Sequence, residues 1–363
     1  MSPDLPETMR GVVLTGHGGL DKLEYRTDLP VPQPGPGQIL IKVAAASVNN
    51  TDVNTRIGWY SKSVRGDTGT GGTDGFADDV DTDGGWAGEP IRFPRIQGAD
   101  CCGRIVAVGD GVNAARIGER VLVRTMQTTG ASGKAFASWT YGSECDGAFA
   151  EYAVADAPEA EPVLSTDWTD LELATIPCAY TTAEGMLQRV GLGAEKVLIT
   201  GAAGGVGSAA VQLAKRRGAV VTAMTSPEKV DALRALGADD TIGRNDDIPQ
   251  ERFDVVVDLV AGPRWPDLLN AIRPGGRYVT SGAIAGPIVE LDVRTLYLRD
   301  LTLFGSTYQP RNILPDIIGY IERGEIKPSV AAVYPLEQLV DAQKAFLDKG
   351  FVGKIAIDVA AER

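Results

Sequence analysis

Apolar residues follow two different patterns along the chain, and the change between them divides it into two regions. Between about residue 10 and residue 154 they form short runs, such as Gly11–Thr15 and Gln38–Ala44, with proline or glycine at most boundaries. Short strands interrupted in this way predict a small, irregular domain of the β-barrel type. From Leu171 onward, apolar runs alternate with segments of helical spacing, which predicts an α/β fold with a doubly wound parallel sheet.

The strongest motif of the second region is a strand, a glycine turn and a helix in direct succession. Val197–Thr200 is a buried strand run, and Ala202–Gly207 follows as an A-x-G-x-x-G form of the dinucleotide-binding fingerprint. Glycines in such a turn let the backbone approach a pyrophosphate and let the next helix pack closely. A second strand, Ala219–Met224, and a second helix, Ser226–Leu236, complete a βαβ unit. The candidate cofactor contacts in the turn are Ala203, Gly204, Gly205, Val206 and Gly207.

Three later strand runs complete the predicted sheet. Ligands of such sheets bind at the carboxyl ends of the strands. Ser281 and Gly282, which end the second of these runs, are therefore candidate cofactor contacts. The tail, from residue 307 to residue 363, contains two amphipathic helices and a final strand. The three runs are Phe253–Val260, Gly276–Gly282 and Leu301–Ser306.

Composition and charge exclude several classes of partner. The 363 residues carry a formal net charge of −13, which argues against a surface for nucleic acid or anionic membranes. No apolar run has the length of a bilayer span, and the first residues do not resemble a signal peptide, so we expect a cytoplasmic protein. The four cysteines show no repeated spacing and are predicted to be reduced thiols.

Residues 61–92 differ from the rest of the first region because glycine and aspartate dominate them. We expect a mobile surface insertion that contributes little to a core. Asp79, Asp81 and Asp83 followed by Gly84 copy the opening of a calcium-binding loop, but Pro90 stands where that loop needs a bidentate glutamate. The pattern favours a solvated acidic loop and leaves weak calcium binding open.

Several motifs resemble the medium-chain dehydrogenase/reductase superfamily, and within it the zinc-independent quinone oxidoreductase branch. The resemblance implies a GroES-like catalytic domain over residues 1–164, a Rossmann NADP-binding domain over 165–306 and a C-terminal return to the catalytic domain over 307–363. It also implies a homodimer or homotetramer, because the last Rossmann strand is similar to the edge through which such enzymes pair. The motifs are Val48-Asn49-x-x-Asp52, Arg56-x-Gly58-x-Tyr60, Gly103-x-Ile-Val-x-x-Val-Gly109, Gly118-x-Arg-Val, Thr181-Thr-Ala183 and Leu236-Gly-Ala-Asp239.

The departures from the superfamily concern metal. The three positions that hold catalytic zinc in its zinc-dependent members carry Asn49, Ala99 and Cys178 here, and one thiolate alone cannot make a three-ligand site. The structural zinc lobe needs four close cysteines, and only Cys145 lies in that part of the chain. The sole histidine, His17, is predicted to be an ordinary turn residue. We therefore expect no metal.

A site without a Lewis acid favours substrates that are already electrophilic, which are quinones and α,β-unsaturated carbonyls. The resemblance implies that Asn49 and Tyr60 donate hydrogen bonds to the substrate and that Thr181 binds the nicotinamide carboxamide. The alternatives stay open: Asn49 caps a turn, Tyr60 packs on the insertion, and Thr181 is simply a helix residue. Asp52 is predicted to be a structural acceptor. Cys101, Cys102 and Cys178 are predicted to be small buried residues rather than nucleophiles.

The end of the second Rossmann strand predicts NADPH as the cofactor. An acid that would repel a 2′-phosphate is absent from Thr225 and Ser226, and Lys229 and Arg244 can supply positive charge. A solvated surface lysine at position 229 is the alternative, and Glu228 is explained by the helix dipole. The predicted function is an NADPH-dependent reductase of a quinone or enone. Two further classes stay open, a zinc alcohol dehydrogenase and an NADP-binding sensor or scaffold without catalysis.

Overall fold

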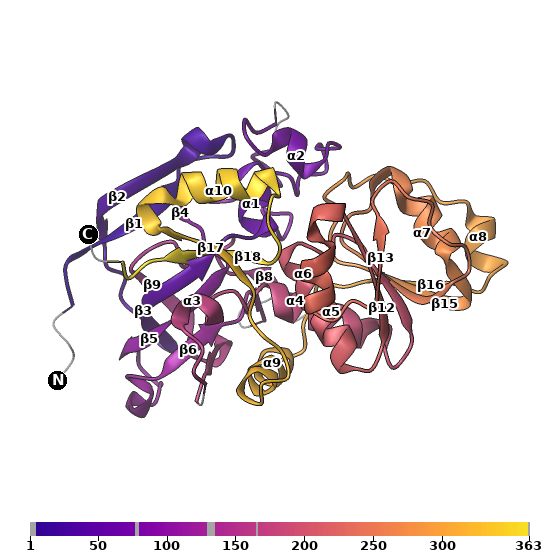
Figure 1. Cartoon of the computed structure of the whole chain (residues 1–363). Coiled ribbons are helices and arrows are strands. Elements are labelled where there is room, and N and C mark those ends of the chain that lie inside the picture. The colour runs from indigo at the N-terminus through magenta and orange to yellow at the C-terminus, as the bar shows by residue number, and fades with distance from the viewer. Residues whose placement is uncertain (1–4, 77–79, 129–134, 165, 362–363) are drawn as a thin grey trace.

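The computed structural model describes residues 5–76, 80–128, 135–164 and 166–361, and it contains two sheet-based bodies side by side (Figure 1). The first body is built on a sheet with strand order β10-β6-β5-β3-β18-β17, in which β9 also pairs with β3, and on a smaller sheet β2-β1-β4. Its strands pair antiparallel except β17 and β18. Its elements are β1 (Thr8–Leu14), β2 (Leu23–Pro30), β3 (Gln38–Ser47), α1 (Asn50–Arg56), α2 (Thr68–Gly71), β4 (Arg95–Ile96), β5 (Asp100–Val108), β6 (Arg120–Val123), β7 (Met126–Gln127), β8 (Trp139–Thr140), β9 (Tyr152–Asp156) and β10 (Ala160–Pro162).

The second body is a six-stranded, all-parallel sheet with the order β13-β12-β11-β14-β15-β16. Alternate residues of its central strand face opposite layers, since Val197 and Ile199 join the hydrophobic cluster of α4 and α5, whereas Leu198 joins that of α7. This confirms the predicted doubly wound α/β sheet. Its elements are α4 (Ala179–Val190), β11 (Lys196–Ile199), α5 (Gly205–Arg216), β12 (Val220–Thr225), α6 (Val230–Ala235), β13 (Asp240–Gly243), β14 (Phe253–Asp258), α7 (Trp265–Ala271), β15 (Ile272–Thr280), α8 (Val293–Tyr297) and β16 (Thr302–Gly305). The short helix α3 (Asp170–Leu173), which precedes α4, packs on β3 and β5 of the first body.

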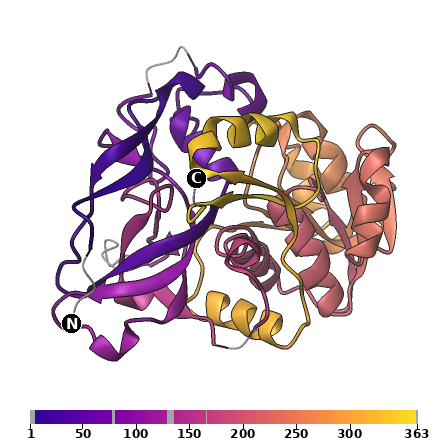
Figure 2. The same cartoon turned by 60° about the vertical axis from the view of Figure 1, so that its left-hand side comes forward.

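The C-terminal segment connects the two bodies. Helix α9 packs through Leu314 and Ile317 into the cluster that covers the parallel sheet. The chain then returns to the first body, where β18 pairs antiparallel with β3 and β17 lies beside β18 (Figure 2). The predicted domain limits remain a prediction. The elements are α9 (Ile313–Glu322), β17 (Val330–Pro335), α10 (Leu339–Asp348) and β18 (Lys354–Asp358).

Two local features do not follow from the apolar pattern alone. The segment from Leu171 to Val190, where helical spacing begins, contains two helices, α3 and α4, because Pro177 has no N–H to donate within a continuous helix. The polar residues 50–56, which follow β3, form the helix α1. The carboxylate of Asp52 accepts a hydrogen bond from the Asn49 N–H at 2.8 Å, and this contact begins the helix.

The prediction that residues 61–92 contribute little to a core is wrong. Val64 and Val80 are buried, and Phe76 packs against the hydrophobic cluster of the first body. The guanidinium of Arg56, fully buried, donates to the carbonyl of Gly72 at 2.6 Å. Glycine makes this packing possible: a Cβ at Gly58, where φ is 68°, would lie 2.4 Å from Val80 Cγ2. The segment therefore packs around a buried cation and a few apolar anchors.

Two other expectations concern ions and membranes. Asp79 of the calcium-like motif lies outside the described residues, and the carboxylate of Asp83 accepts from the Lys62 N–H at 3.0 Å. Within the described parts of the chain, no group of three or more His, Cys, Asp or Glu residues could hold a metal ion. Among the same residues, no helix has the length and apolar character needed to cross a membrane.

Candidate functional site

The glycine turn has the geometry that a dinucleotide requires. Gly204 is the N-cap of α5, and no side chain caps its first N–H groups. A Cβ at Gly207 would lie 2.2 Å from the Gly201 carbonyl oxygen, so only glycine lets α5 approach the end of β11 this closely. Ala203 is buried, and Val206 packs against the core. The residues present therefore fit a pyrophosphate at the N-terminus of α5.

The end of β12 carries the residues that we predicted to select the cofactor. Thr225 is buried, and its Oγ1 has no hydrogen-bond partner among the described residues. The hydroxyl of Ser226 donates to the Glu228 carboxylate instead of capping a helix. Lys229 ends a short 3-10 turn over Pro227–Lys229 and is only 6% exposed, so it is not the solvated surface lysine of the alternative interpretation.

The other cofactor candidates lie at the carboxyl ends of neighbouring strands. Thr280 Oγ1 donates to the Gly282 carbonyl at 3.0 Å, and this contact shapes the loop that contains Ser281. A Cβ at Gly282 would lie 3.1 Å from the Leu259 carbonyl oxygen, directly after β14. Arg244 follows β13, and its positive charge contributes to lowering the pKa of Lys229, after the larger effect of burial. The structure therefore brings these candidates together at the carboxyl ends of the parallel strands.

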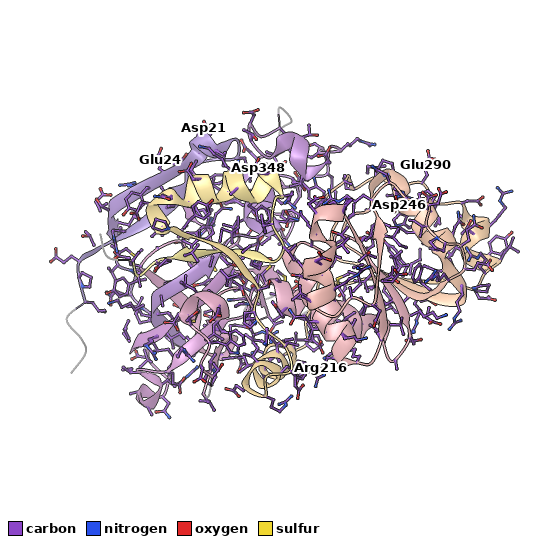
Figure 3. The ribbon with its side chains drawn as sticks, in the orientation of Figure 1. Asp21, Glu24, Arg216, Asp246, Glu290 and Asp348 are labelled. Atoms are coloured by element: carbon purple, nitrogen blue, oxygen red, sulfur yellow. The ribbon has the colours of Figure 1, made fainter. Side chains whose placement is uncertain are left out.

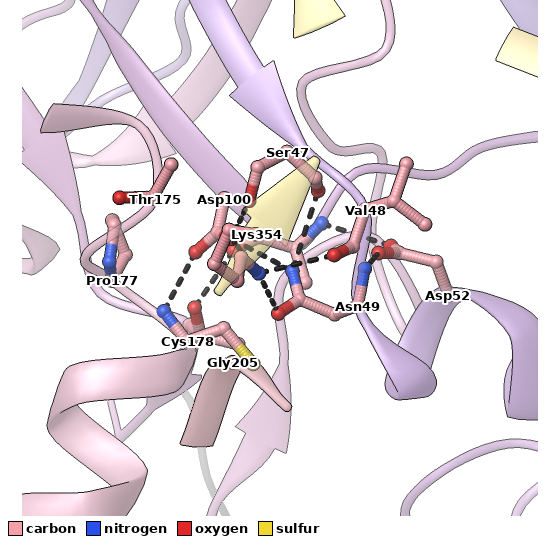
Figure 4. Close-up of polar contacts among 12 residues, drawn as sticks. Ser47, Val48, Asn49, Asp52, Asp100, Thr175, Pro177, Cys178, Gly205 and Lys354 are labelled. Carbon is pink, nitrogen blue, oxygen red and sulfur yellow. Dashed lines mark hydrogen bonds and ion pairs between the residues drawn. The ribbon is translucent and has the colours of Figure 1, made fainter. Parts of the chain in front are cut away.

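A buried ion pair lies between the main sheet of the first body and the glycine turn before α5 (Figure 4). Lys354, the first residue of β18, is 2% exposed, and its Nζ lies 3.0 Å from Asp100 Oδ2. The same ammonium donates to the Val48 carbonyl at 3.1 Å and to Asn49 Oδ1. Its side chain also touches the turn, because a Cβ at Gly205 would lie 2.6 Å from Lys354 Cδ. The charges of Lys354 and Asp100 therefore compensate each other inside the protein.

Lys354 and Asp100 were not among the predicted site residues. The one sequence signal for Lys354 is a lysine at the start of an apolar strand, where a solvated residue is the usual interpretation. Its partner lies 254 positions earlier. The two meet because β3 pairs with β18 on one side and with β5, which begins at Asp100, on the other.

All side-chain hydrogen-bonding groups of Asn49 take part in the network around the Lys354–Asp100 ion pair. Its Nδ2 donates to Asp100 Oδ2 at 2.7 Å and to the Ser47 carbonyl at 3.3 Å. Both amide hydrogens are therefore used within the protein, and the side-chain oxygen accepts from Lys354. In this arrangement Asn49 positions the network and has no hydrogen left for a substrate oxygen.

Tyr60 and Cys178 lie in the same surroundings. The Tyr60 hydroxyl donates to Thr51 Oγ1 at 3.1 Å. Burial raises the pKa of Tyr60, with smaller contributions in the same direction from Cys178 and Asp52. Burial also raises the pKa of the Cys178 thiol, so that residue is not a nucleophile at neutral pH. The Thr181 hydroxyl donates to the carbonyl of Pro177, one turn earlier in the chain.

Asp52 has a structural position, as we expected. Its carboxylate accepts from the N–H groups of Asn49 at 2.8 Å, Gly98 at 3.3 Å and Ala99 at 3.1 Å. Burial raises the pKa of Asp52 to about 7, although these backbone donors favour the ionised form. His17, which we predicted to be an ordinary turn residue, makes a hydrogen bond through Nδ1 to the Thr55 carbonyl at 2.9 Å.

The residues at the three zinc positions do not fit that ion. Asp100 Oδ1 accepts from the Cys178 N–H at 2.6 Å, so the positions of Asn49 and Cys178 do come together. The donors there are one thiol, one amide and a carboxylate that already binds the Lys354 ammonium. Zinc requires at least three nitrogen, sulfur or free carboxylate ligands.

Comparisons with known proteins agree with this architecture. The chain matches an alcohol dehydrogenase GroES-like domain over residues 35–164 and a zinc-binding dehydrogenase domain over residues 205–323. The crystal structure of a putative alcohol dehydrogenase from Sinorhizobium meliloti 1021 is 45% identical, covers 98% of both chains and superimposes with a TM-score of 0.87. The chloroplastic NADPH-dependent alkenal/one oxidoreductase of Arabidopsis thaliana is 27% identical over 97% of this chain and 80% of its own length. The quinone oxidoreductase of Lama guanicoe is 28% identical over 96% of this chain and 97% of its own.

These matches cover both sheets and the segment that joins them. The GroES-like match spans the strands that surround Asn49 and Asp100. The dehydrogenase match begins at Gly205, inside the glycine turn. Sequence motifs, fold and relatives therefore agree, and the chain belongs to the medium-chain dehydrogenase/reductase superfamily.

Proposed function

We propose that the protein is an NADPH-dependent reductase that transfers hydride to a quinone or an α,β-unsaturated carbonyl without a catalytic zinc. The observation that carries the proposal is the Lys354–Asp100 ion pair, which occupies the surroundings of Asn49 and Cys178. An ammonium whose three hydrogens are shared among protein acceptors cannot polarise a ketone. Quinones and enones accept hydride without such polarisation. The names of the Arabidopsis and Lama relatives agree with this substrate class.

When bound, the nicotinamide supplies the hydride, and the protein positions the acceptor and stabilises its developing oxyanion. Tyr60 is the donor that we assign to that oxyanion, because its phenol has a hydrogen to donate, whereas both amide hydrogens of Asn49 are used within the protein. The present partner of Tyr60 is the neutral hydroxyl of Thr51, which a substrate oxygen can replace. Asn49 and Lys354 hold this part of the site in shape. Thr181 remains the proposed contact for the carboxamide, through the free lone pair of its hydroxyl oxygen.

Zinc analysis and chelation test this proposal directly. We expect less than about 0.1 zinc per chain in purified protein, and unchanged NADPH oxidation with 1,4-benzoquinone or an enone after prolonged chelation, because the donor set cannot hold the ion. One zinc per chain, with activity lost on chelation and restored by zinc, would support a zinc alcohol dehydrogenase. NADPH binding without turnover of any quinone or enone would support the sensor or scaffold.

We further propose a homodimer formed through the open edge of the parallel sheet. Among the described residues, β16 pairs only with β15, so its other edge is free. Around α8, which precedes this strand, large apolar side chains are exposed, with Leu298 at 69% and Tyr297 at 60%. An exposed edge strand beside an apolar patch is typical of a surface that a second copy covers.

A further inference from the structure

Two lysines from different domains meet beside the end of β12. Lys229 belongs to the Rossmann domain, and its Nζ donates to the backbone carbonyl of Lys349. Lys349 follows α10 of the catalytic domain, next to Asp348, which is labelled in Figure 3. Its own Nζ lies 3.3 Å from Asn50 Oδ1 and 3.8 Å from the centre of the Phe346 ring. The two ammonium groups therefore lie on opposite sides of one domain boundary.

These cations have no matching anion. Among the described residues, Lys229, Lys349 and Arg244 take part in no ion pair within 4.0 Å. Burial lowers the pKa of Lys349 to about 8, and repulsion from Lys229 acts in the same direction. The pKa of Lys229 is lowered by burial and then by Arg244. The exposed carboxylate of Glu228 attracts Lys229 and Arg244 without an ion pair within 4.0 Å, and it accepts a hydrogen bond from the Ser226 hydroxyl.

An unsatisfied hydroxyl lies on the same segment. Thr225 is 2% exposed, and its Oγ1 has no partner among the described residues. A buried polar atom without a partner costs free energy unless a ligand completes its hydrogen bonds. Within the described part of the chain, the ammonium groups of Lys229 and Lys349 lack an ion-pair partner, and the Thr225 hydroxyl at the end of β12 lacks a hydrogen-bond partner. Such groups fit a ligand that carries negative charge and several oxygen atoms.

We propose that Lys349 binds the same phosphate as Lys229, so that the 2′-phosphate of the cofactor is held between the two domains. The inference rests on the proposed use of NADPH and adds a residue from the catalytic domain to the site that selects it. A phosphomonoester dianion supplies the missing counter-charge. Because it binds both lysines, the phosphate also favours the arrangement in which the two domains contact each other.

Binding titrations with matched variants test this inference. The variants are Lys349→Met and Lys229→Met, and the control is Lys344→Met, which removes an exposed lysine of the same helix α10. Dissociation constants are measured by fluorescence for NADPH and NADH. We expect Lys349→Met to weaken NADPH at least about fivefold and NADH less than about twofold, because a charge-assisted contact is lost. Lys349→Arg should keep most of the preference for NADPH.

Competition with 2′,5′-ADP and 5′-ADP separates the 2′-phosphate from the other phosphates. Lys349→Met should weaken 2′,5′-ADP and leave 5′-ADP unchanged. If Lys349→Met behaves like Lys344→Met while Lys229→Met discriminates between cofactors, the inference is wrong and the proposed NADPH site stands. If neither variant discriminates, the proposed cofactor preference itself fails. Equal weakening of both ADP isomers would assign Lys349 to the pyrophosphate and overturn the inference.

Discussion

The role of the Tyr60 hydroxyl as oxyanion donor can be tested by removing that group alone. The phenol donates to Thr51 Oγ1 at 3.1 Å, and burial raises the pKa of Tyr60 further above neutral pH. We expect Tyr60→Phe to lower kcat about 100-fold while the KM for NADPH stays within about twofold, since one oxyanion donor is lost. Steady-state kinetics with a quinone measure this effect. Tyr297→Phe, which removes an exposed phenol, is the control. Full activity of Tyr60→Phe would remove the phenol from the mechanism.

Lys354 allows a second test at the scale of single residues. Lys354→Met leaves the buried carboxylate of Asp100 without its ammonium. We expect the free energy of unfolding to fall by about 3–5 kcal/mol, which is typical when one partner of a buried pair is removed. Urea denaturation measures the change. In the matched control, Lys344→Met breaks the exposed pair with Asp341 and should cost less than about 1 kcal/mol. Equal stability of the two variants would show that the buried pair is not needed.

At the scale of elements, the glycine-rich segment 61–92 is either a dispensable surface insertion or a packed part of the fold. Thr68 N–H donates to the Ile284 carbonyl at 3.2 Å, so α2 reaches the Rossmann domain. We expect deletion of residues 62–88 with a short linker to lower the melting temperature by at least about 8 °C, because Arg56 loses a buried acceptor and the apolar anchors are removed. Calorimetry measures this shift. An unchanged melting temperature would show that the segment is dispensable for the stability of the fold.

The accuracy of the helix predictions follows from where each helix is stabilised. The ends of helix α5 follow from local sequence, since Gly204 and Gly218 lie just outside them and Gly218 has a left-handed φ of 80°. Helix α1 is hard to predict because its apolar face is short and its start depends on Asp52. Ser226 has the sequence of an N-cap, but its hydroxyl binds Glu228 instead.

At the scale of the whole molecule, the proposed dimer gives a test that is independent of catalysis. Leu298→Glu introduces a charge into the exposed apolar patch beside β16. We expect this variant to be a monomer by light scattering, whereas the wild type has twice the mass of one chain. Ile117→Glu, an exposed apolar position of the first domain, is the control and should remain a dimer. A Leu298→Glu dimer would place the interface elsewhere.

The sequence by itself determined the features that depend on local pattern. The glycine turn and the alternation of strands and helices could both be predicted from neighbouring residues, because turn chemistry and periodicity act over a few positions. The departure from the zinc ligands at Asn49 and Ala99 followed from the resemblance to the superfamily. The fold class and the superfamily followed from these features and are confirmed by the structure and the relatives.

Only the tertiary structure decided which distant side chains share one site. The pairing of β3 with both β18 and β5 places Lys354 on Asp100, and the approach of α10 to the end of β12 places Lys349 beside Lys229. The packing of residues 61–92 around Arg56 depends on the same long-range contacts. A buried charge is stable only when its counter-charge or acceptors are brought to it, and those partners lie from 16 to 306 positions away along the chain.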